Sequence, residues 1–156
     1  MNTEKSKLLT LLSPHTVRAH YKAKRWEEAI RAGGNLLVRV GAVTENYVQG
    51  MVDGMKTLGP YIVIAPGIAM PHARPEAGAK RLGVSLVTLK EPIPFGNVTN
   101  DPVSLVFCLA ATDEASHLSL MAEWVRLLQD KNKVQRLREA ETEGEILAVI
   151  KELEVK

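Results

Sequence analysis

A histidine enclosed by prolines is the first feature of the chain that could do chemistry. His72 lies within the segment Pro66-Gly67-Ile68-Ala69-Met70-Pro71-His72-Ala73-Arg74-Pro75-Glu76. Proline restricts the backbone, so a histidine in this loop loses little further entropy when a partner docks. Imidazole titrates near neutral pH and therefore offers a nucleophilic ring nitrogen in the cell. Arg74 adds an always-protonated planar donor that is suited to phosphate or carboxylate.

A second histidine stands where a buried strand is predicted to end and a helix to begin. His117 closes the segment Ala110-Ala111-Thr112-Asp113-Glu114-Ala115-Ser116-His117. We expect Ser116 or Thr112 to cap that helix, which leaves His117 in its first turn. Unpaired N–H groups and the helix dipole favour anions there, so His117 is a candidate for holding a phosphoryl group.

Both histidines also have plain structural interpretations. A backbone carbonyl can satisfy His72 within its own loop, and His117 can be a surface residue of a first helical turn. His15 and His20 fall in the predicted first loop and edge strand, and they have no assigned role. The residues alone leave these alternatives open.

The residue patterns of several other kinds of site are missing. His72, His117 and Cys108 are far apart in sequence, and the chain has no H-x-x-x-H or C-x-x-C pattern, so we predict no metal site and no cofactor. The single cysteine, Cys108, is expected to be an inert buried thiol. No G-x-G-x-x-G, P-loop or nucleophile elbow is present. The net charge of +2 is spread along the chain without interleaved aromatic residues, which argues against nucleic-acid binding.

The hydrophobic pattern predicts alternating helices and strands. Helices are predicted over residues 3–12, 25–40, 44–56, 132–139 and 142–153, with a long amphipathic helix after residue 111. Strands are predicted over residues 16–21, 61–65, 82–89 and 103–111. We expect the run 61–65 to be buried on both faces. The long helix is expected to bury a face made of Leu118, Met121, Ala122, Val125 and Leu128.

These elements predict an α/β fold. A chain of 156 residues, 46% hydrophobic and 24% charged, fits a single domain that spans residues 1–156. Helices that alternate with buried strands indicate three layers, with a mixed, mostly parallel β-sheet and helices on both faces. Ligands in such folds bind beyond the C-terminal ends of the strands, where His72 and His117 both fall. Gly33-Gly34, inside the second predicted helix, implies close packing against another element or a break.

The sequence favours a cytoplasmic protein. The apolar run of residues 8–12 is shorter than a signal-peptide core and ends before Pro14. No stretch approaches the length needed to span a bilayer. The single cysteine also suits a reducing compartment.

The segments around His72 and His117 resemble the enzyme IIA domains of the mannitol/fructose class (type 2) of the phosphoenolpyruvate-dependent sugar phosphotransferase system. The family's active loop is hydrophobic-Ala-hydrophobic-Pro-His, and here it is Ile68-Ala69-Met70-Pro71-His72. Its second histidine follows a strand and opens a helix, as His117 does. The resemblance covers roughly residues 26–150. It is closest to the ascorbate-specific branch, on the evidence of Gly59-Pro60-Tyr61, residues 65–72 and Arg74-Pro75-Glu76.

The resemblance implies a phosphocarrier. The small carrier protein HPr would donate a phosphoryl group to His72, which would pass it to a cysteine of enzyme IIB for uptake of a sugar, L-ascorbate on the closest match. His117 would orient or stabilise that group, and the membrane enzyme IIC would be reached only through IIB. A homodimer is left open. The alternatives are a regulatory IIA-like phosphoprotein that controls another protein, and a small-molecule-binding α/β domain without transfer activity.

One departure from the family pattern concerns charge near the active histidine. Mannitol-type members carry an arginine in the preceding helix and a glutamate in the loop, where this chain has Lys56 or a neighbour, and Pro66. Those roles are not carried over. We hypothesise that Arg74 supplies the missing cation from the other side of His72. The apolar residues 68–70 either form a docking surface or are buried under the loop.

Overall fold

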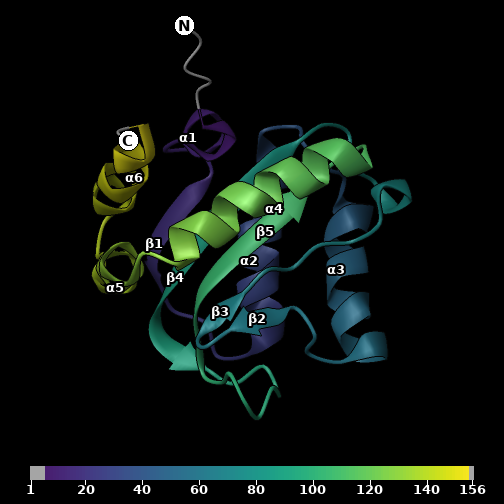
Figure 1. Ribbon diagram of the computed structural model, residues 1–156. Helices are drawn as coiled ribbons and strands as arrows, with labels where there is room; N and C mark the ends of the chain where they lie inside the picture. The colour runs from purple at the N-terminus through teal and green to yellow at the C-terminus, as the bar shows by residue number, and fades with distance from the viewer. Residues whose placement is uncertain (1–5, 155–156) are drawn as a thin grey trace, which may run out of the picture.

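The computed structural model describes residues 6–154 (Figure 1). Its helices are α1 Lys7–Leu11, α2 Trp26–Arg39, α3 Glu45–Leu58, α4 Glu114–Leu128, α5 Lys131–Glu139 and α6 Glu143–Lys151. Two short 3₁₀ turns occupy Pro75–Ala77 and Glu152–Glu154. The strands are β1 Val17–Tyr21, β2 Val63–Ala65, β3 Ile68–Ala69, β4 Gly83–Ile93 and β5 Val103–Ala110.

The five strands form one mixed sheet in the order β1-β4-β5-β3-β2. β1 pairs with β4 in parallel, and β3 pairs with β5 in parallel. The β4–β5 and β2–β3 pairs are antiparallel. The long strands β4 and β5 occupy the centre, and the predicted edge strand β1 lies at one edge. The expected mixed sheet is confirmed.

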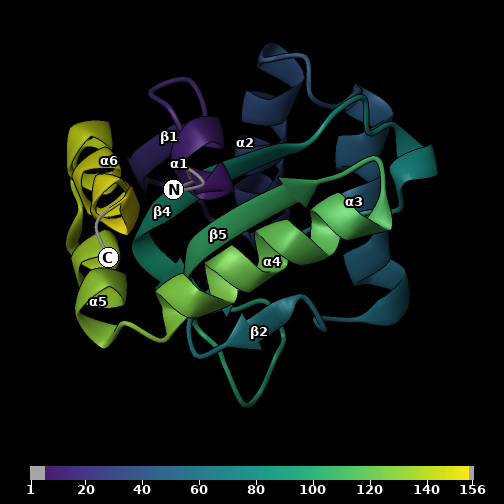
Figure 2. The same ribbon diagram turned by 45° about the horizontal axis from the view of Figure 1, so that its top comes forward.

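Helices cover both faces of the sheet, as Figures 1 and 2 show. α2 and α3 pack on one face, where Val106 and Cys108 of β5 point. α1, α4, α5 and α6 pack on the other face, where Leu105 and Phe107 of the same strand point. This division follows from the alternation of side chains along a strand. The predicted three-layer α/β domain is therefore confirmed.

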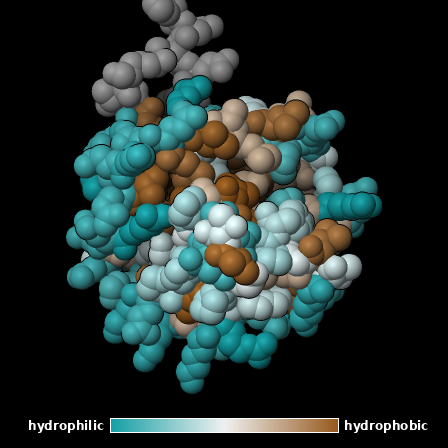
Figure 3. Space-filling model, turned by 60° about the horizontal axis from the view of Figure 1, so that its bottom comes forward, coloured by the Kyte–Doolittle hydropathy of each residue, from teal (hydrophilic) through white to brown (hydrophobic). Residues whose placement is uncertain are grey.

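Large hydrophobic side chains reach the surface at a few positions. Figure 3, which brings the bottom of Figure 1 forward, shows hydrophobic residues toward the middle and upper part of that face, with hydrophilic residues around them. Among the residues that the structure describes, the exposed large hydrophobic ones are Leu58, Tyr61, Ile64, Val98, Leu118 and Val125. Within the described part of the chain, no helix combines the length and the apolar character that a membrane crossing requires.

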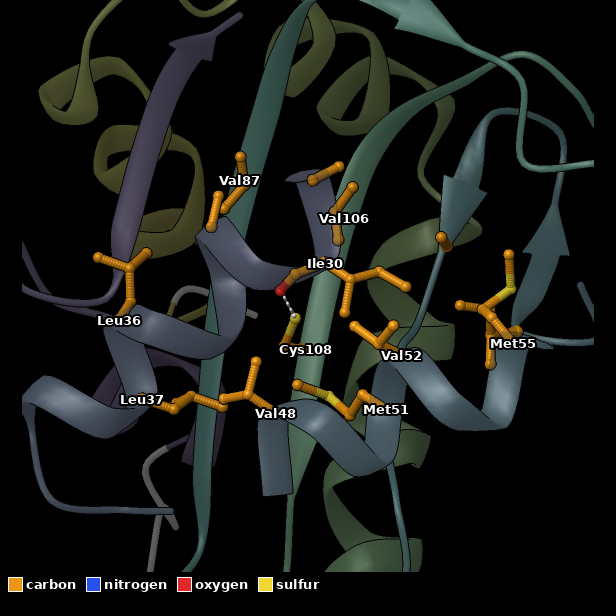
Figure 4. Packing of buried hydrophobic residues seen from close by; sticks show 14 of the residues in the cluster. Ile30, Leu36, Leu37, Val48, Met51, Val52, Met55, Val87, Val106 and Cys108 are labelled. Carbon is orange, nitrogen blue, oxygen red and sulfur yellow. Dashed lines mark hydrogen bonds between the residues drawn. The ribbon is translucent and has the colours of Figure 1, made fainter. Parts of the chain in front are cut away.

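The two adjacent glycines of α2 allow that helix to approach its neighbours closely. A Cβ atom on Gly33 would lie 2.6 Å from Sγ of Cys108, and one on Gly34 would lie 2.8 Å from Cγ2 of Val48. Figure 4 shows the resulting core, in which the Cys108 thiol faces the Ile30 carbonyl at 3.9 Å. Cys108 is buried, as the sequence predicts, and burial raises its pKa to about 12, which keeps the thiol protonated at neutral pH.

The expectation that residues 61–65 are buried on both faces is wrong. The apolar run forms only the three-residue edge strand β2, and Tyr61 and Ile64 are 48% and 38% exposed. The chain turns at Gly67, whose φ of 76° suits glycine, and returns as β3. The short β3, which the sequence pattern does not predict, is the strand that pairs with β5.

The predicted buried face of α4 is also partly wrong. Leu118 and Val125 are 57% and 43% exposed, and the buried residues are Leu120, Trp124 and Leu127. Trp124 stacks on Phe107 of β5, with ring centroids 3.9 Å apart. Both stripes have helical spacing, and the one that contains the large indole is buried because it removes more apolar surface from water.

Candidate functional site

Parallel pairing of β3 with β5 brings His72 and His117 together. His72 follows the end of β3, and His117 lies in the first turn of α4, which begins shortly after β5 ends. Because neighbouring parallel strands end at the same edge of the sheet, both segments emerge side by side (Figure 1). The two imidazole rings lie with their centroids 5.8 Å apart and their planes at 55°.

A pocket of about 690 Å³ contains both rings. It lies between α3, the loop that follows β3, and the start of α4. Its lining residues are Tyr47, Gly50, Gly54, Leu58, Tyr61, His72, Ala73, Arg74, Pro75, Ala77, Ala111, Asp113, Glu114 and His117. A largely apolar wall with a few convergent polar groups is typical of a functional site. Within residues 6–154, no group of three or more His, Cys, Asp or Glu side chains could hold a metal ion.

The half-buried ring of His72 is oriented by its own loop. Its Nδ1 lies 2.9 Å from the carbonyl oxygen of Met70. A carbonyl only accepts hydrogen bonds, so Nδ1 carries the proton and Nε2 carries the lone pair. The Tyr61 ring meets the imidazole edge-on, at 5.8 Å between centroids and 83° between planes. The carbonyl contact expected in the plain structural interpretation thus exists, and it leaves Nε2 as the nitrogen that is not bonded to the loop.

The sequence predicts Ser116 or Thr112 as the cap of α4. The N-cap is instead Asp113. Its carboxylate accepts the Ser116 N–H at 2.7 Å and the Ser116 hydroxyl at 3.1 Å. These hydrogen bonds, the backbone one first, lower the pKa of Asp113. Aspartate is as good a cap as serine and stands directly before the first helical residue. Because a carboxylate already occupies this end of α4, the ring of His117 is the better candidate for holding an anion.

His117 is held largely in its neutral form at neutral pH. Partial burial lowers its pKa, the nearby His72 lowers it further, and Glu114 opposes both effects. A neutral imidazole does not repel its neighbour and still has one N–H to donate. His117 therefore has the properties needed to hydrogen-bond a negatively charged group placed between the two rings.

Arg74 lies on the rim of the pocket. Its side chain is exposed, and its backbone precedes the 3₁₀ turn Pro75–Ala77. Within residues 6–154, its guanidinium has no hydrogen-bond or ion-pair partner. By contrast, Lys56 does not line the pocket. Pro66 lies on the far side of β3, where its carbonyl accepts from Arg138 at 2.5 Å. Arg74 is thus the cation closest in sequence to His72 that also borders the pocket.

Residues 68–70 are buried and do not form a docking surface. Ile68, Ala69 and Met70 are 3% exposed or less. The exposed apolar residues of the pocket are instead Leu58 and Tyr61. The sequence interpretation missed both residues. Tyr47, Gly50, Gly54 and Leu58 recur on one side of α3, and this spacing could have found Leu58. Tyr61 lies beyond the helix, so the spacing gives no signal for it.

Comparison with known proteins places the chain in a family. Residues 10–153 match the family model described as "Phosphoenolpyruvate-dependent sugar phosphotransferase system, EIIA 2". The chain belongs to this family. The match includes both histidine segments, and it confirms the resemblance that they indicated.

Curated and solved EIIA proteins agree with this assignment. The chain is 42% identical over 142 residues to the ascorbate-specific PTS system EIIA component of Escherichia coli (strain K12), over 90% of this chain and 92% of that protein. The solution structure of the mannitol-specific cryptic phosphotransferase enzyme IIA CmtB from Escherichia coli has a TM-score of 0.84 at 34% identity, over 92% of this chain and 97% of that one. A complex of enzyme IIAMTL and phosphorylated enzyme IIBMTL from Escherichia coli matches with a TM-score of 0.79 at 30% identity, over 90% and 99% of the two chains. The chain is a sugar phosphotransferase system component of the EIIA type.

Proposed function

We propose that this EIIA chain carries a phosphoryl group on Nε2 of His72, which it accepts from phospho-HPr and passes to a cysteine of enzyme IIB. The observation that carries the proposal is the orientation of His72. Its Nδ1 is held by the Met70 carbonyl, and its ring lies beside His117 in an open pocket. A nitrogen lone pair is thereby kept available next to a second imidazole.

Each transfer exchanges one bond to phosphorus for another. The lone pair of Nε2 attacks the phosphorus of the donor phosphohistidine, whose P–N bond breaks and returns its electron pair to the donor ring. A cysteine thiolate of IIB then attacks the same phosphorus, and the electrons of the Nε2–P bond return to His72. Nδ1 keeps its proton in both steps. The chain contributes alignment and charge stabilisation, which are the main requirements of phosphoryl transfer.

Two side chains of the pocket are suited to stabilise the phosphoryl group. His117 donates a hydrogen bond to a phosphoryl oxygen, since its ring lies 5.8 Å from that of His72. Its lowered pKa keeps it neutral until the phosphoryl charge arrives. Arg74 approaches from the exposed rim and screens the remaining charge. No cofactor is needed for this chemistry.

The relatives suggest the partners and the sugar. A relative at 42% identity is named as ascorbate-specific, which supports L-ascorbate as the sugar. A solved complex of an enzyme IIA with a phosphorylated enzyme IIB supports IIB as the acceptor. In this proposal the chain works in the cytoplasm and reaches the membrane enzyme IIC only through IIB. HPr and IIB would both dock over the pocket, against the exposed Leu58 and Tyr61.

The test is phosphorylation in a purified system. The chain is incubated with phosphoenolpyruvate, enzyme I and HPr, and the modified residue is mapped by mass spectrometry. We expect a single phosphoryl group on His72, its loss in His72→Ala, and its retention in His15→Ala, a histidine outside the pocket. Modification of another residue, or none in the wild type, would overturn the proposal.

A second stage separates transport from regulation. The phosphorylated chain is mixed with an ascorbate-type IIB and, separately, with a mannitol-type IIB, and transfer to the IIB cysteine is followed. Fast transfer to the ascorbate-type protein supports a transport phosphocarrier. If neither cysteine accepts the group, the regulatory interpretation replaces the transport one.

A further inference from the structure

The pairing of β3 with β5 continues beyond the end of β3 to the active histidine. Ile68 pairs with Leu105 and Ala69 with Val106, so the same register sets His72 opposite Leu109. In each bridged pair of a parallel ladder, one residue, here Leu109, donates its N–H to the residue before its partner and accepts from the residue after that partner. The first of these two bonds is present, because Leu109 donates to the Pro71 carbonyl at 3.0 Å.

A tyrosine hydroxyl replaces the second bond. The Tyr47 hydroxyl of α3 donates to the Leu109 carbonyl at 2.7 Å, and the Ala73 N–H donates to the same hydroxyl oxygen at 3.1 Å. The Ala73 carbonyl also lies 3.2 Å from that oxygen. The Tyr47 hydroxyl therefore lies between the Ala73 N–H and the Leu109 carbonyl, which would otherwise hydrogen-bond directly. This bond would belong to the pair formed by His72 and Leu109.

This hydroxyl is protonated at neutral pH and is buried. The Tyr47 side chain is 1% exposed, and burial raises its pKa to about 12. Its backbone N–H donates to Thr44, the N-cap of α3, at 3.4 Å. Tyr47 thus links the start of α3 to the end of β5 and to the residue that follows His72.

We propose that Tyr47 is a positioning residue, whose hydroxyl holds the His72 loop apart from β5 so that Nε2 faces the phosphoryl donor beside His117. The inference rests on the proposed phosphocarrier function. Direct pairing of Ala73 with Leu109 would draw the loop toward β5 by the width of one hydroxyl group and shift the imidazole with it. A displacement of this size is enough to slow an aligned transfer severely.

The test compares Tyr47→Phe with Tyr21→Phe, which removes a hydroxyl from β1, away from the pocket. We expect Tyr47→Phe to lower the single-turnover rate of His72 phosphorylation about tenfold to a hundredfold, while the KM for phospho-HPr stays within about twofold. The nitrogen NMR signals of the His72 imidazole should shift in Tyr47→Phe alone. Tyr21→Phe should match the wild type in all three measurements.

Amide hydrogen exchange on the wild-type chain gives an independent check that does not depend on how the variant folds. The Ala73 amide should be protected by its bond to Tyr47 and should exchange more slowly than the neighbouring Arg74 amide. Equal exchange at the two positions, or a Tyr47→Phe variant with wild-type rate and NMR signals, would overturn the inference. If the wild type takes up no phosphoryl group on His72, the proposed function fails instead, whereas the exchange and NMR results still report on the geometry.

Discussion

At the scale of single residues, the orientation of the His72 ring depends on the backbone of the loop that carries it. The Met70 carbonyl, two residues before the ring, fixes the tautomer through Nδ1 at 2.9 Å. Many functional histidines use a separate carboxylate for this purpose. A carbonyl brings no net charge, so the tautomer of His72 is set without a carboxylate bonded to its ring.

The neutral His117 ring should matter for the rate of transfer. A hydrogen bond to a charged group is worth about 1.5–3 kcal/mol, so we expect His117→Ala to slow phosphorylation of His72 by one to two decades. Rapid-quench measurement of single-turnover transfer from phospho-HPr gives the rate. His15→Ala, which lies outside the pocket, serves as the control. A wild-type rate in His117→Ala would exclude a role in transfer.

Arg74 is expected to make a smaller contribution because its side chain is exposed. Ion pairs in water are weak, so Arg74→Ala should slow transfer by at most about fivefold. The effect should be largest at low ionic strength and fade as salt is added, since screening shortens the reach of an exposed charge. Arg39→Ala, an exposed arginine at the end of α2, is the matched control. If the transfer rates of the two variants depend on salt in the same way, Arg74 does not contribute to the site.

The lowered pKa of His117 also predicts how stability depends on pH. The unfolded chain binds a proton at this residue more readily than the folded chain, so acidification favours unfolding. Denaturant unfolding between about pH 7.5 and pH 5.5 spans the ordinary histidine range. The wild type should lose more stability over this interval than His117→Gln does. Parallel curves for the two proteins would contradict the direction given for this pKa.

At the scale of elements, local signals in the sequence predict most boundaries. Gly41, with a φ of 78°, follows α2, and Thr44 accepts the Tyr47 N–H at the start of α3, as an N-cap should. The long apolar runs of β4 and β5 are enough to predict two central strands. These features depend on residues adjacent in sequence, and so they can be predicted without knowing the fold.

Features that depend on distant contacts could not be predicted. The two-residue strand β3 exists because Ile68 and Ala69 pair with β5, and nothing in its length indicates a strand. Trp124 selects the buried face of α4 by stacking on Phe107 of another element. The proximity of His72 and His117 could not be predicted, because it depends on the strand order, which the sequence does not give. The hydrogen bonds of Tyr47 could not be predicted either, because they depend on where α3 packs.

The close contact of α2 with β5 gives a prediction about stability. Alanine favours helices over glycine by about 1 kcal/mol, yet a Cβ on Gly33 would lie 2.6 Å from Sγ of Cys108. Because overpacking costs more than this gain, Gly33→Ala should lower the free energy of unfolding by about 1–2 kcal/mol. Chemical denaturation measures the change.

Two further variants separate the clash from other effects. Gly33→Ala should be less damaging in a Cys108→Ala background, because the sulfur atom is absent there. Gly144→Ala in α6, where the nearest atom to a new Cβ is 3.8 Å away, should leave stability unchanged or raise it by about 0.5 kcal/mol. Equal effects of Gly33→Ala in both backgrounds would show that the sulfur is not what the new methyl group meets.

At the scale of the whole molecule, the sheet separates two cores and leaves the pocket at one end of β5. The loop of residues 94–102, which joins β4 to β5, lies at the opposite end of the same strand (Figure 1). Phosphoryl transfer needs direct approach of a donor nitrogen or an acceptor sulfur to His72. In the proposed function, a protein partner must therefore cover the pocket that contains His72, whereas the loop of residues 94–102, which does not line the pocket, can stay free.

This polarity predicts which exposed apolar residue contributes to docking. Leu58, at the end of α3, is 69% exposed and lines the pocket, whereas Val98 is 99% exposed and does not line it. The loop of Val98 contacts the chain just after α3, where Asn97 donates to the Pro60 carbonyl at 3.2 Å. Burying a leucine against a partner is worth about 1.5–3 kcal/mol, so Leu58→Gln should raise the KM for phospho-HPr about tenfold or more and leave kcat within about twofold. Val98→Gln should change neither value, because Val98 does not line the pocket. Steady-state transfer assays measure both values, and a larger effect at Val98 than at Leu58 would place the docking surface outside the pocket that contains His72.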